Sequence, residues 1–336
     1  MMMLIAALFV GFVLVAIPNA VWLLWWLVAA IVRCPKPAYA PFGYTALGLA
    51  IAAWLVLGYG FFIGRFRYEV KTFEYSNPDI PEAFDGYRIV QISDLHLSTY
   101  HDRPAALQRI VAAMNAEHPD LICFTGDLVT TGTAEARPFV PILQQLRATD
   151  GIASVLGNHD LMIYTCLTEE ERVQETEQLA RLEQDTLGWQ LLRNRHITIS
   201  RNGQSLTVAG VDNCSCGNEG FRSVCCGDLE QALAQSSGFR ILLSHDPTHW
   251  RAKVLPATDV PLTLSGHTHA GQVKLFGKTL ADHTFHESAG WYYDGGQSLY
   301  VNTGIGCTLP VRLNCPSEIT VITLKGISKN NSLIFK

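Results

Sequence analysis

The sequence predicts an α/β domain preceded by a membrane-spanning helical segment. Two runs without a charged residue, 4–32 and 38–64, stand at the start of the 336-residue chain. From residue 85 onward, short apolar segments typical of buried strands alternate with helix-like segments, and several of these strands end in Asp, Asn or His. In open α/β sheets, ligands bind at the carboxyl ends of the strands, so this recurrence indicates a functional site.

The composition excludes one class of partner. The chain has a net charge of -5 at pH 7 and a pI near 6.1. Such a chain offers no basic field to a polyanion, so we expect no nucleic-acid partner.

The two apolar runs predict a membrane anchor over residues 1–66. As one helix, run 4–32 would be about 43 Å long, longer than a bilayer core of about 30 Å, so it must tilt, kink or fold back at Pro18-Asn19. Run 44–64 has the usual spanning length. A signal peptide fits poorly, because no basic residue precedes the first run and a second apolar run follows.

Basic residues around the anchor indicate its orientation. Arg33 and Lys36 lie between the runs, and three basic residues follow the second run: Arg65, Arg67 and Lys71. If each run spans once, the following domain lies on the more positive side, which favours the cytoplasm. A hairpin at Pro18-Asn19 would reverse this orientation.

After a predicted linker, 67–84, the first half of the domain alternates strands and helices. Strand 88–93 leads to Asp94 and His96, and a helix is predicted over 103–117. Strand 121–124 leads to Asp127, a helix follows near 138–147, and strand 152–156 leads to Asn158 and His159.

The second half is predicted to form another sheet. A charge-rich, solvated helix is expected over 168–186. Strands are expected over 189–194, 197–200 and 206–211, a helix from about 228, and strand 241–243 before His245. Strand 262–265 leads to His267 and His269, and the closing strands are 299–302 and 318–323. The domain spans 85–326, and a polar tail follows over 327–336.

The strand-end groups suit metal ions. They are Asp94, His96, Asp127, Asn158, His159, His245, His267 and His269. Carboxylate and amide oxygens mixed with imidazoles, without a thiolate, favour Mn²⁺, Fe²⁺ or Zn²⁺. Seven ligands suffice for two divalent ions sharing one carboxylate, and such a pair polarises a phosphoryl oxygen and converts a bridging water into hydroxide.

Each of these residues alone has an ordinary explanation. Asp94 and Asp127 could cap helices, Asn158 could be a turn amide, and His245 could be a hydrogen-bonded core imidazole. Capping does not require five of the chain's eleven histidines to gather at strand ends, so the joint pattern favours the metal site.

Five ordered blocks resemble those of the calcineurin-like metallophosphoesterases. They are Asp94-Leu95-His96, Gly126-Asp127, Gly157-Asn158-His159-Asp160, Ser244-His245 and Gly266-His267-Thr268-His269. The resemblance runs from about Arg88 to Leu324, and the subfamily looks like the bacterial membrane-anchored phosphoesterases of the inner membrane. It implies a four-layer α/β/β/α sandwich of two mixed sheets.

The resemblance also implies roles. Asp94, His96, Asp127 and His269 would hold the first ion, and Asp127, Asn158, His245 and His267 the second, with Asp127 as the bridge. His159 would act as general acid or stabilise transition-state charge, and Asp160 would orient it. Asn158 and His159 are candidates for contact with a substrate phosphate. Apart from the resemblance, Arg312 could bind that phosphate through two hydrogen bonds or could be an ordinary solvated charge, and Asn302 is a weaker candidate.

The expected function is a membrane-anchored phosphohydrolase that uses a metal-bridging hydroxide on a phosphomonoester, phosphodiester or pyrophosphate. The bilayer favours a lipid-linked substrate, such as a UDP-diacylglucosamine-like pyrophosphate. The alternative is a membrane scaffold that keeps the fold without catalysis; it predicts gaps among the ligands, and this chain has none.

Four of the nine cysteines crowd one loop: Cys214, Cys216, Cys225 and Cys226. Three alternatives remain open for them. They can be loop residues without an essential role, disulfide partners in an oxidising compartment, or a zinc site with atypical spacing.

Overall fold

The computed structural model describes residues 2–217 and 224–326, so the predicted polar tail 327–336 lies outside the described residues. The chain divides into two compact units. One comprises Met1–Arg65 with Leu309–Leu313, and the other comprises Phe66–Thr308 with Asn314–Lys336.

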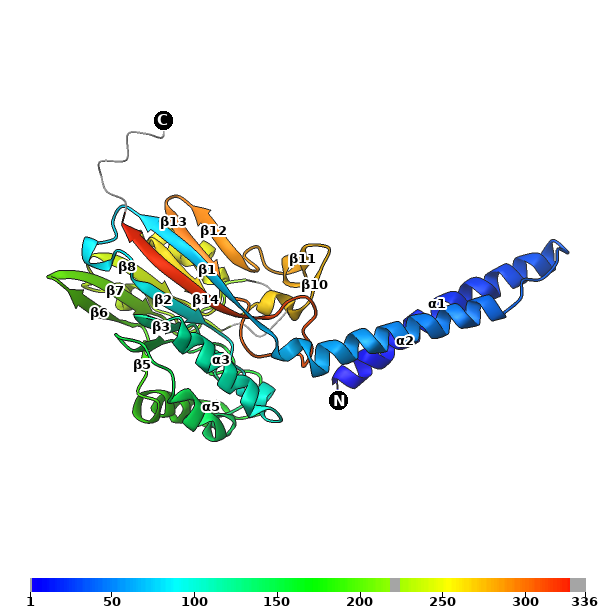
Figure 1. Cartoon of the computed structure of the whole chain (residues 1–336), viewed down its shortest axis with the longest axis horizontal. Coiled ribbons are helices and arrows are strands. Elements are labelled where there is room, and N and C mark those ends of the chain that lie inside the picture. Colours follow the sequence, from blue (N-terminus) through cyan, green and yellow to red (C-terminus); the bar gives the residue numbers. More distant parts are fainter. Residues whose placement is uncertain (1, 218–223, 327–336) are drawn as a thin grey trace, which may run out of the picture. The chain divides into compact units, whose positions relative to one another are not determined.

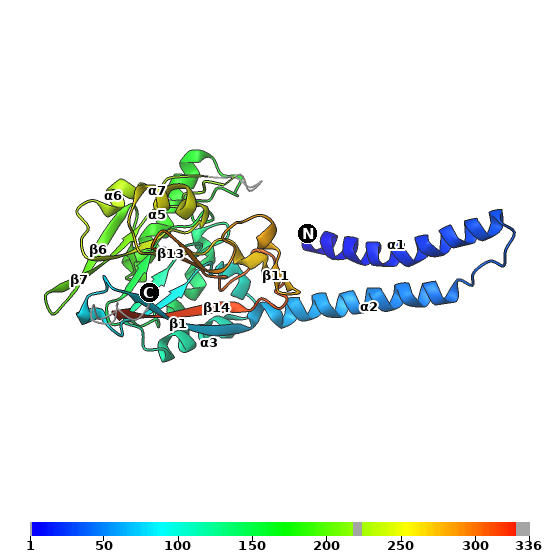
Figure 2. The same cartoon turned by 90° about the horizontal axis from the view of Figure 1, so that it is seen from above.

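The first unit contains the two apolar helices, α1 (Met2–Ile31) and α2 (Ala40–Phe62), which run side by side (Figures 1 and 2). Helix α1 continues through Pro18, so the alternative turn at Pro18-Asn19 does not form. The Tyr39 hydroxyl donates to Oδ1 of Asn19 (2.8 Å), and the rings of Trp22 and Tyr39 pack edge to face. These contacts join the connection between the helices to α1.

Both helices are long and apolar enough to cross a membrane, over Gly11–Ile31 and Ala40–Phe66. Their large apolar side chains are mostly exposed, including Phe12 at 69% and Leu55 at 69%. A helix of a soluble core would bury such side chains, so this exposure suits lipid contact.

The second unit contains two six-stranded mixed sheets. The first has the order β1-β14-β2-β3-β4-β5, with bounds Tyr68–Asn77, Ser317–Gly326, Arg88–Ile92, Leu121–Phe124, Ile152–Ser154 and Gln190–Leu191. The second has the order β12-β13-β9-β8-β7-β6, with bounds Gly290–Asp294, Gln297–Val301, Leu262–Ser265, Phe239–Leu243, Gln204–Gly210 and Arg195–Arg201. A separate hairpin pairs β10 (Lys274–Leu275) with β11 (Lys278–Thr279).

The helices of this unit are α3 (Pro104–Ala116), α4 (Val140–Leu143), α5 (Glu169–Arg181), α6 (Leu229–Leu233) and α7 (Leu255–Ala257). Proline in the first turn suits the start of α3. Thr168 and Glu171 form a capping box that starts α5. Three glutamates in its first turn stabilise the helix, because they lie at the positive end of its dipole.

The alternation of buried side chains along the strands places the sheets face to face. On β2, Ile89 packs in a cluster that also contains Val208 and Leu264 of the second sheet. The neighbouring Val90 packs in another cluster with residues of α3 and α5. Since successive side chains of a strand point to opposite faces, the first sheet separates these clusters.

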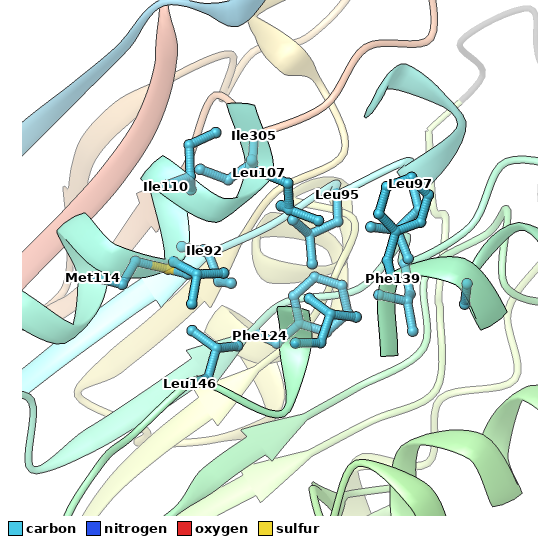
Figure 3. Close-up of a cluster of buried hydrophobic side chains, with 14 of the residues drawn as sticks. Ile92, Leu95, Leu97, Leu107, Ile110, Met114, Phe124, Phe139, Leu146 and Ile305 are labelled. Carbon is cyan, nitrogen blue, oxygen red and sulfur yellow. The ribbon is translucent and has the colours of Figure 1, made fainter. Parts of the chain in front are cut away.

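Helices cover both outer faces. Figure 3 shows the cluster on the outer face of the first sheet, where Leu107, Ile110 and Met114 of α3 pack near Ile92 and Phe124. On the outer face of the second sheet, Leu242 packs with Ala232 of α6 and with Trp250. This confirms the four-layer α/β/β/α sandwich.

Three sequence-based expectations were wrong in detail. Most of the segment 67–84 is not a linker, because Tyr68–Asn77 forms the edge strand β1, which pairs in parallel with β14 over ten residues. Strand β5, expected in the second sheet, pairs with β4 in the first. The helix expected near 138–147 contracts to α4, which is four residues long.

Candidate metal centre

The predicted ligands come together because the strands that precede them end at one edge of the sandwich. Asp94 and His96 follow β2, Asp127 follows β3, and Asn158 and His159 follow β4 in the first sheet. His245 follows β8, and His267 and His269 follow β9 in the second sheet. Both sheets therefore contribute to one site, as the sequence predicts.

One group of side chains is formed by Asp94, His96 and His269, all buried. The Nε2 atoms of His96 and His269 lie 3.2 Å apart. Nε2 of His269 lies 3.3 Å from Oδ1 of Asp94, and Nε2 of His96 lies 3.5 Å from Oδ2 of Asp127. These atoms face one another and surround one point.

A second group is formed by Asp127, Asn158, His245 and His267. Oδ1 of Asn158 lies 2.9 Å from Nε2 of His245 and 2.8 Å from Nδ1 of His267. Nε2 of His245 lies 3.2 Å from Oδ2 of Asp127. The Oδ2 atom of Asp127 thus lies beside a histidine of each group, where a bridging ligand is required.

This donor set fits a pair of divalent ions. Ring nitrogens of different histidines approach to 3.2 and 3.3 Å, an arrangement that a shared cation stabilises. Oδ1 of Asp94 is buried and accepts no hydrogen bond within the described chain. A buried carboxylate oxygen without a donor is costly unless a cation compensates its charge.

The electrostatics of the site also favour positive charge. Burial lowers the pKa of His245, but the carboxylates of Asp127 and Asp94 outweigh burial and raise that pKa to about 10. Burial opposes ionisation of Asp127, yet the imidazoles of His245, His159 and His96 hold its pKa well below its usual range. A proton on His245 therefore supplies charge that a metal ion would replace, and metal uptake would release it.

Hydrogen bonds to main-chain carbonyls fix two of the imidazole rings. Nδ1–H of His245 donates to the Thr125 carbonyl (2.7 Å), which leaves Nε2 free to bind a cation. Nδ1–H of His159 donates to the Thr130 carbonyl (2.9 Å), and the half-buried ring packs against that of Tyr164 in a tilted arrangement. His159 also lies within ligand distance of His96 and Asp127.

Asp160 does not orient His159, contrary to the expectation. Its carboxylate instead accepts hydrogen bonds from the backbone N–H groups of Gly157, Asp127, Leu128 and Val129, at 3.0, 2.7, 2.9 and 3.2 Å. A buried carboxylate with four such donors fixes the turn after β3, so Asp160 positions Asp127, the predicted bridging ligand.

The backbone of the site is unusual as well. Five of the seven predicted ligands have positive φ: Asp94 (53°), His96 (36°), Asp127 (61°), His267 (72°) and His269 (51°). Such conformations are uncommon outside glycine and concentrate at functional sites.

Glycines in the blocks permit close packing around the ligands. A Cβ atom on Gly157 would lie 2.1 Å from Oδ1 of Asp127, and one on Gly266 would lie 2.5 Å from Oδ2 of Asp94. Neither position has room for a side chain, so these glycines are required by sterics.

Two further candidates lie elsewhere in the fold. Arg312 belongs to the helical unit, where its N–H donates to the Gly60 carbonyl (3.4 Å), and its predicted substrate contact stays a prediction. Asn302 is fully buried; its amide donates to Oγ1 of Thr320 (2.9 Å) and its Oδ1 accepts from the N–H of Gly304 (2.7 Å). These bonds give Asn302 a structural role.

Asp246, which sequence reasoning missed, contacts the site from behind. Its Oδ2 lies 3.6 Å from Nε2 of His267, while its Oδ1 accepts from the N–H and hydroxyl of Thr248. It directly follows His245, and this adjacency was the available signal. A carboxylate behind a ligating histidine increases the basicity of that ligand.

We expect Asp246→Asn to weaken binding of the second metal ion by about 10 to 100-fold, because outer carboxylate partners contribute that much to metal affinity. Metal titration with elemental analysis measures the change. Asp294→Asn, at a side chain that is 54% exposed, should bind metal like the wild type. Unchanged affinity in Asp246→Asn would exclude the role of Asp246.

Cys214 and Cys225 form a disulfide, and the ligand atoms of Cys214, Cys216 and Cys225 also lie close enough together to be candidates for a metal site, so the disulfide and zinc alternatives both stay open. Cys226 is a free thiol, and Sγ of Cys216 lies 3.6 Å from Sγ of Cys214. Part of this loop, 218–223, lies outside the described residues. Disulfides persist in oxidising compartments, whereas the basic residues after α2 favour the cytoplasm, so the two observations favour opposite sides of the membrane.

The fold and the paired ligand groups define the class, and comparison with known proteins agrees. The calcineurin-like phosphoesterase family matches residues 87–271. The chain therefore belongs to this family and is a metal-dependent phosphoesterase. Members of the family generally use two metal ions, and candidate ligands for both are present in this chain.

Two relatives match most of the chain. The uncharacterized metallophosphoesterase YkuE of Bacillus subtilis (strain 168) is 32% identical over 302 residues, which cover 84% of this chain and 94% of that protein. A transmembrane protein with metallophosphoesterase domain from Danio rerio is 32% identical over 297 residues, 86% of this chain. The match spans only 64% of the Danio rerio protein.

Solved structures resemble the chain more weakly. The NAD nucleotidase of Haemophilus influenzae has a TM-score of 0.41 and 15% identity, covering 66% of this chain and 45% of that chain. A dimetal phosphatase from Danio rerio has a TM-score of 0.37 and 15% identity, covering 67% and 90%. At these scores neither structure indicates a substrate.

Proposed function

We propose that the protein is a membrane-anchored hydrolase that uses two metal ions to cleave a phosphomonoester, phosphodiester or pyrophosphate. The observation that carries this proposal is the position of the Asp127 carboxylate, 3.5 Å from His96 on one side and 3.2 Å from His245 on the other. One carboxylate between two ligand groups suits a dinuclear site.

The residues have separate roles in the proposed reaction. Asp94, His96, Asp127 and His269 would hold one ion, and Asp127, Asn158, His245 and His267 would hold the other. When bound, Mn²⁺, Fe²⁺ or Zn²⁺ would supply Lewis-acid chemistry to a phosphoryl oxygen and would lower the pKa of a water molecule. His159, tethered by its Nδ1–H to the Thr130 carbonyl, presents Nε2 toward the leaving-group oxygen and acts as general acid or stabilises the developing charge. Asn158 and Arg312 contact the substrate phosphate.

The anchor comprises residues 1–66, with α1 and α2 each spanning the bilayer once. This topology puts both chain ends on one side, and the basic residues Arg65, Arg67 and Lys71 favour the cytoplasmic side of a bacterial inner membrane. Tethering raises the local concentration of lipid-linked substrates. A lipid pyrophosphate, such as a UDP-diacylglucosamine-like molecule, is therefore the substrate class that we favour.

A catalytically inactive scaffold is the second candidate, and no observation favours it. All seven ligand positions and His159 carry the expected residues, and the ligand atoms converge as a working centre requires.

Chelation tests the proposal. The full-length protein in detergent should hydrolyse bis(p-nitrophenyl) phosphate, lose turnover after treatment with a chelator, and regain it with Mn²⁺, Fe²⁺ or Zn²⁺, because bound ions would activate the attacking water. Elemental analysis should find about two ions per chain in the active preparation. Full turnover of metal-free protein would refute the two-metal reaction, and bound metal without turnover of any ester would support the scaffold.

A further inference from the structure

The hairpin β10–β11 has an apolar, solvent-exposed tip. Phe276 exposes its entire side chain, and Leu275 and Leu280 are each 52% exposed. Leu275 pairs with Lys278, so Phe276 and Gly277 are the two turn residues, with φ of 50° and 83°. Such a turn favours Asn or Gly, because both residues need positive φ. Phenylalanine here is therefore unfavourable both for backbone conformation and for solvation.

The charges around the tip indicate what covers it. Lys274 and Lys278 flank Phe276 and are exposed, and neither has an ion-pair partner within the described chain. The nearest acidic side chain in sequence is that of Asp282, and its carboxylate accepts hydrogen bonds from the N–H and hydroxyl of Thr279. Exposed aromatic and leucine side chains flanked by lysines suit the interface of a bilayer that contains anionic lipid.

The topology places this hairpin at the same edge as the metal centre. It follows the one-turn helix His269–Gln272, which begins with a predicted ligand. In the first sheet, Thr320 of β14 pairs with Gln91, so by the same register Ser317 is level with Asp94. Ser317 also pairs with Tyr68, the first residue of β1. The chain thus enters the sheet at the edge that carries the ligands.

The connection from the anchor to that edge is short. Helix α2 ends at Phe62 and β1 begins at Tyr68. Even fully extended, the intervening residues span at most about 20 Å. If α2 crosses a bilayer, the entry point of β1 stays within that distance of the end of α2.

We propose that the β10–β11 tip is a second membrane contact, in which Phe276 and Leu275 insert into the interface of an anionic bilayer while Lys274 and Lys278 bind lipid phosphates. This contact holds the metal centre against the headgroups, where a lipid-linked phosphate is presented. The inference rests on the membrane anchoring included in the proposed function, and not on turnover.

Photo-crosslinking of the full-length chain tests the contact. Benzoyl-phenylalanine replaces Phe276 in protein reconstituted into nanodiscs of phosphatidylcholine with or without phosphatidylglycerol. A matched control carries the same group at Val173 on α5, which is 57% exposed. We expect lipid adducts from position 276 and none from position 173. Adding Lys274→Glu and Lys278→Glu should reduce the adducts several-fold, and only in anionic nanodiscs, because the lysines act through lipid charge.

The outcomes separate the two proposals. A chain that co-elutes with nanodiscs but gives no lipid adduct from position 276 overturns the hairpin contact and leaves the anchor intact. An adduct to a second protein chain instead of lipid identifies a protein partner and also overturns it. A chain that does not stay with the nanodiscs refutes the anchor and the hairpin contact together, whatever the activity of the metal centre.

Discussion

Replacing Asp127 by alanine should abolish hydrolysis of bis(p-nitrophenyl) phosphate, with a loss of at least about a thousandfold, because a dinuclear centre depends on its bridging ligand. Oδ2 of Asp127 is the carboxylate oxygen closest to both His96 and His245. Without it, neither ion keeps its full ligand set. Elemental analysis of the purified variant should show fewer ions per chain than in the wild type.

Asp127→Asn separates loss of the centre from loss of the fold. Asparagine has nearly the same shape and tolerates the positive φ of 61° at this position. Asparagine also removes the negative charge that, against the cost of burial, the imidazoles of His245, His159 and His96 stabilise in the metal-free site, where they hold the pKa of Asp127 well below its usual range. We therefore expect Asp127→Asn to be inactive, while its metal-free form still folds cooperatively but melts below metal-free wild type.

The surface variant Asp294→Ala controls for general effects of removing an acidic residue, and it should keep full activity. Wild-type turnover in both Asp127 variants would show that the reaction does not depend on this carboxylate, and it would refute the two-metal proposal.

Replacing Gly157 by alanine should have the second-largest effect. The added Cβ would lie 2.1 Å from Oδ1 and 2.7 Å from the backbone N of Asp127. Because Asp127 is buried between the sheets' ends, the clash must displace the bridging ligand or the turn held by Asp160. We expect a destabilisation of about 1–3 kcal/mol, typical of overpacking, together with loss of activity.

Thermal melting and metal content measure both effects of Gly157→Ala. Gly58→Ala is the matched control, because apart from its chain neighbours and the backbone of its own helix no atom lies within 4 Å of a Cβ at that position, and it should behave like the wild type. An active, fully metallated Gly157→Ala protein would mean that the turn can move without loss of the centre, against the steric argument.

Much of the centre could be predicted because its ligands follow directly after apolar strands. In a sheet with parallel neighbours, strand ends meet at one edge, so the order of Asp94, Asp127 and Asn158 along the chain indicates their proximity. The role of Asp160 could not be predicted, since its four donors come from two separate turns. Only the folded backbone brings those N–H groups to one carboxylate.

The wrong prediction of a linker at the position of β1 has a different cause. Its side chains alternate between exposed and half-buried positions and include Glu69, Lys71 and Glu74, so the segment resembles a polar linker. Ten residues of pairing with β14, together with the packing of Phe73 and Tyr75 in the core, hold this strand in the sheet. Lys71 also forms an ion pair with the buried Glu318 (2.6 Å), a partner 247 positions away that no local pattern indicates.

Because five predicted ligand residues have left-handed backbone conformations, folding of the chain already fixes the geometry of the centre before any ion binds. An unfolded chain would rarely visit that combination of dihedrals, since each costs on the order of 1 kcal/mol. An ion would therefore bind to ligand residues whose backbone is already in position, and its binding would not require the backbone to change. Among Mn²⁺, Fe²⁺ and Zn²⁺, occupancy would then follow cellular supply and intrinsic affinity more than any adjustment by the polypeptide.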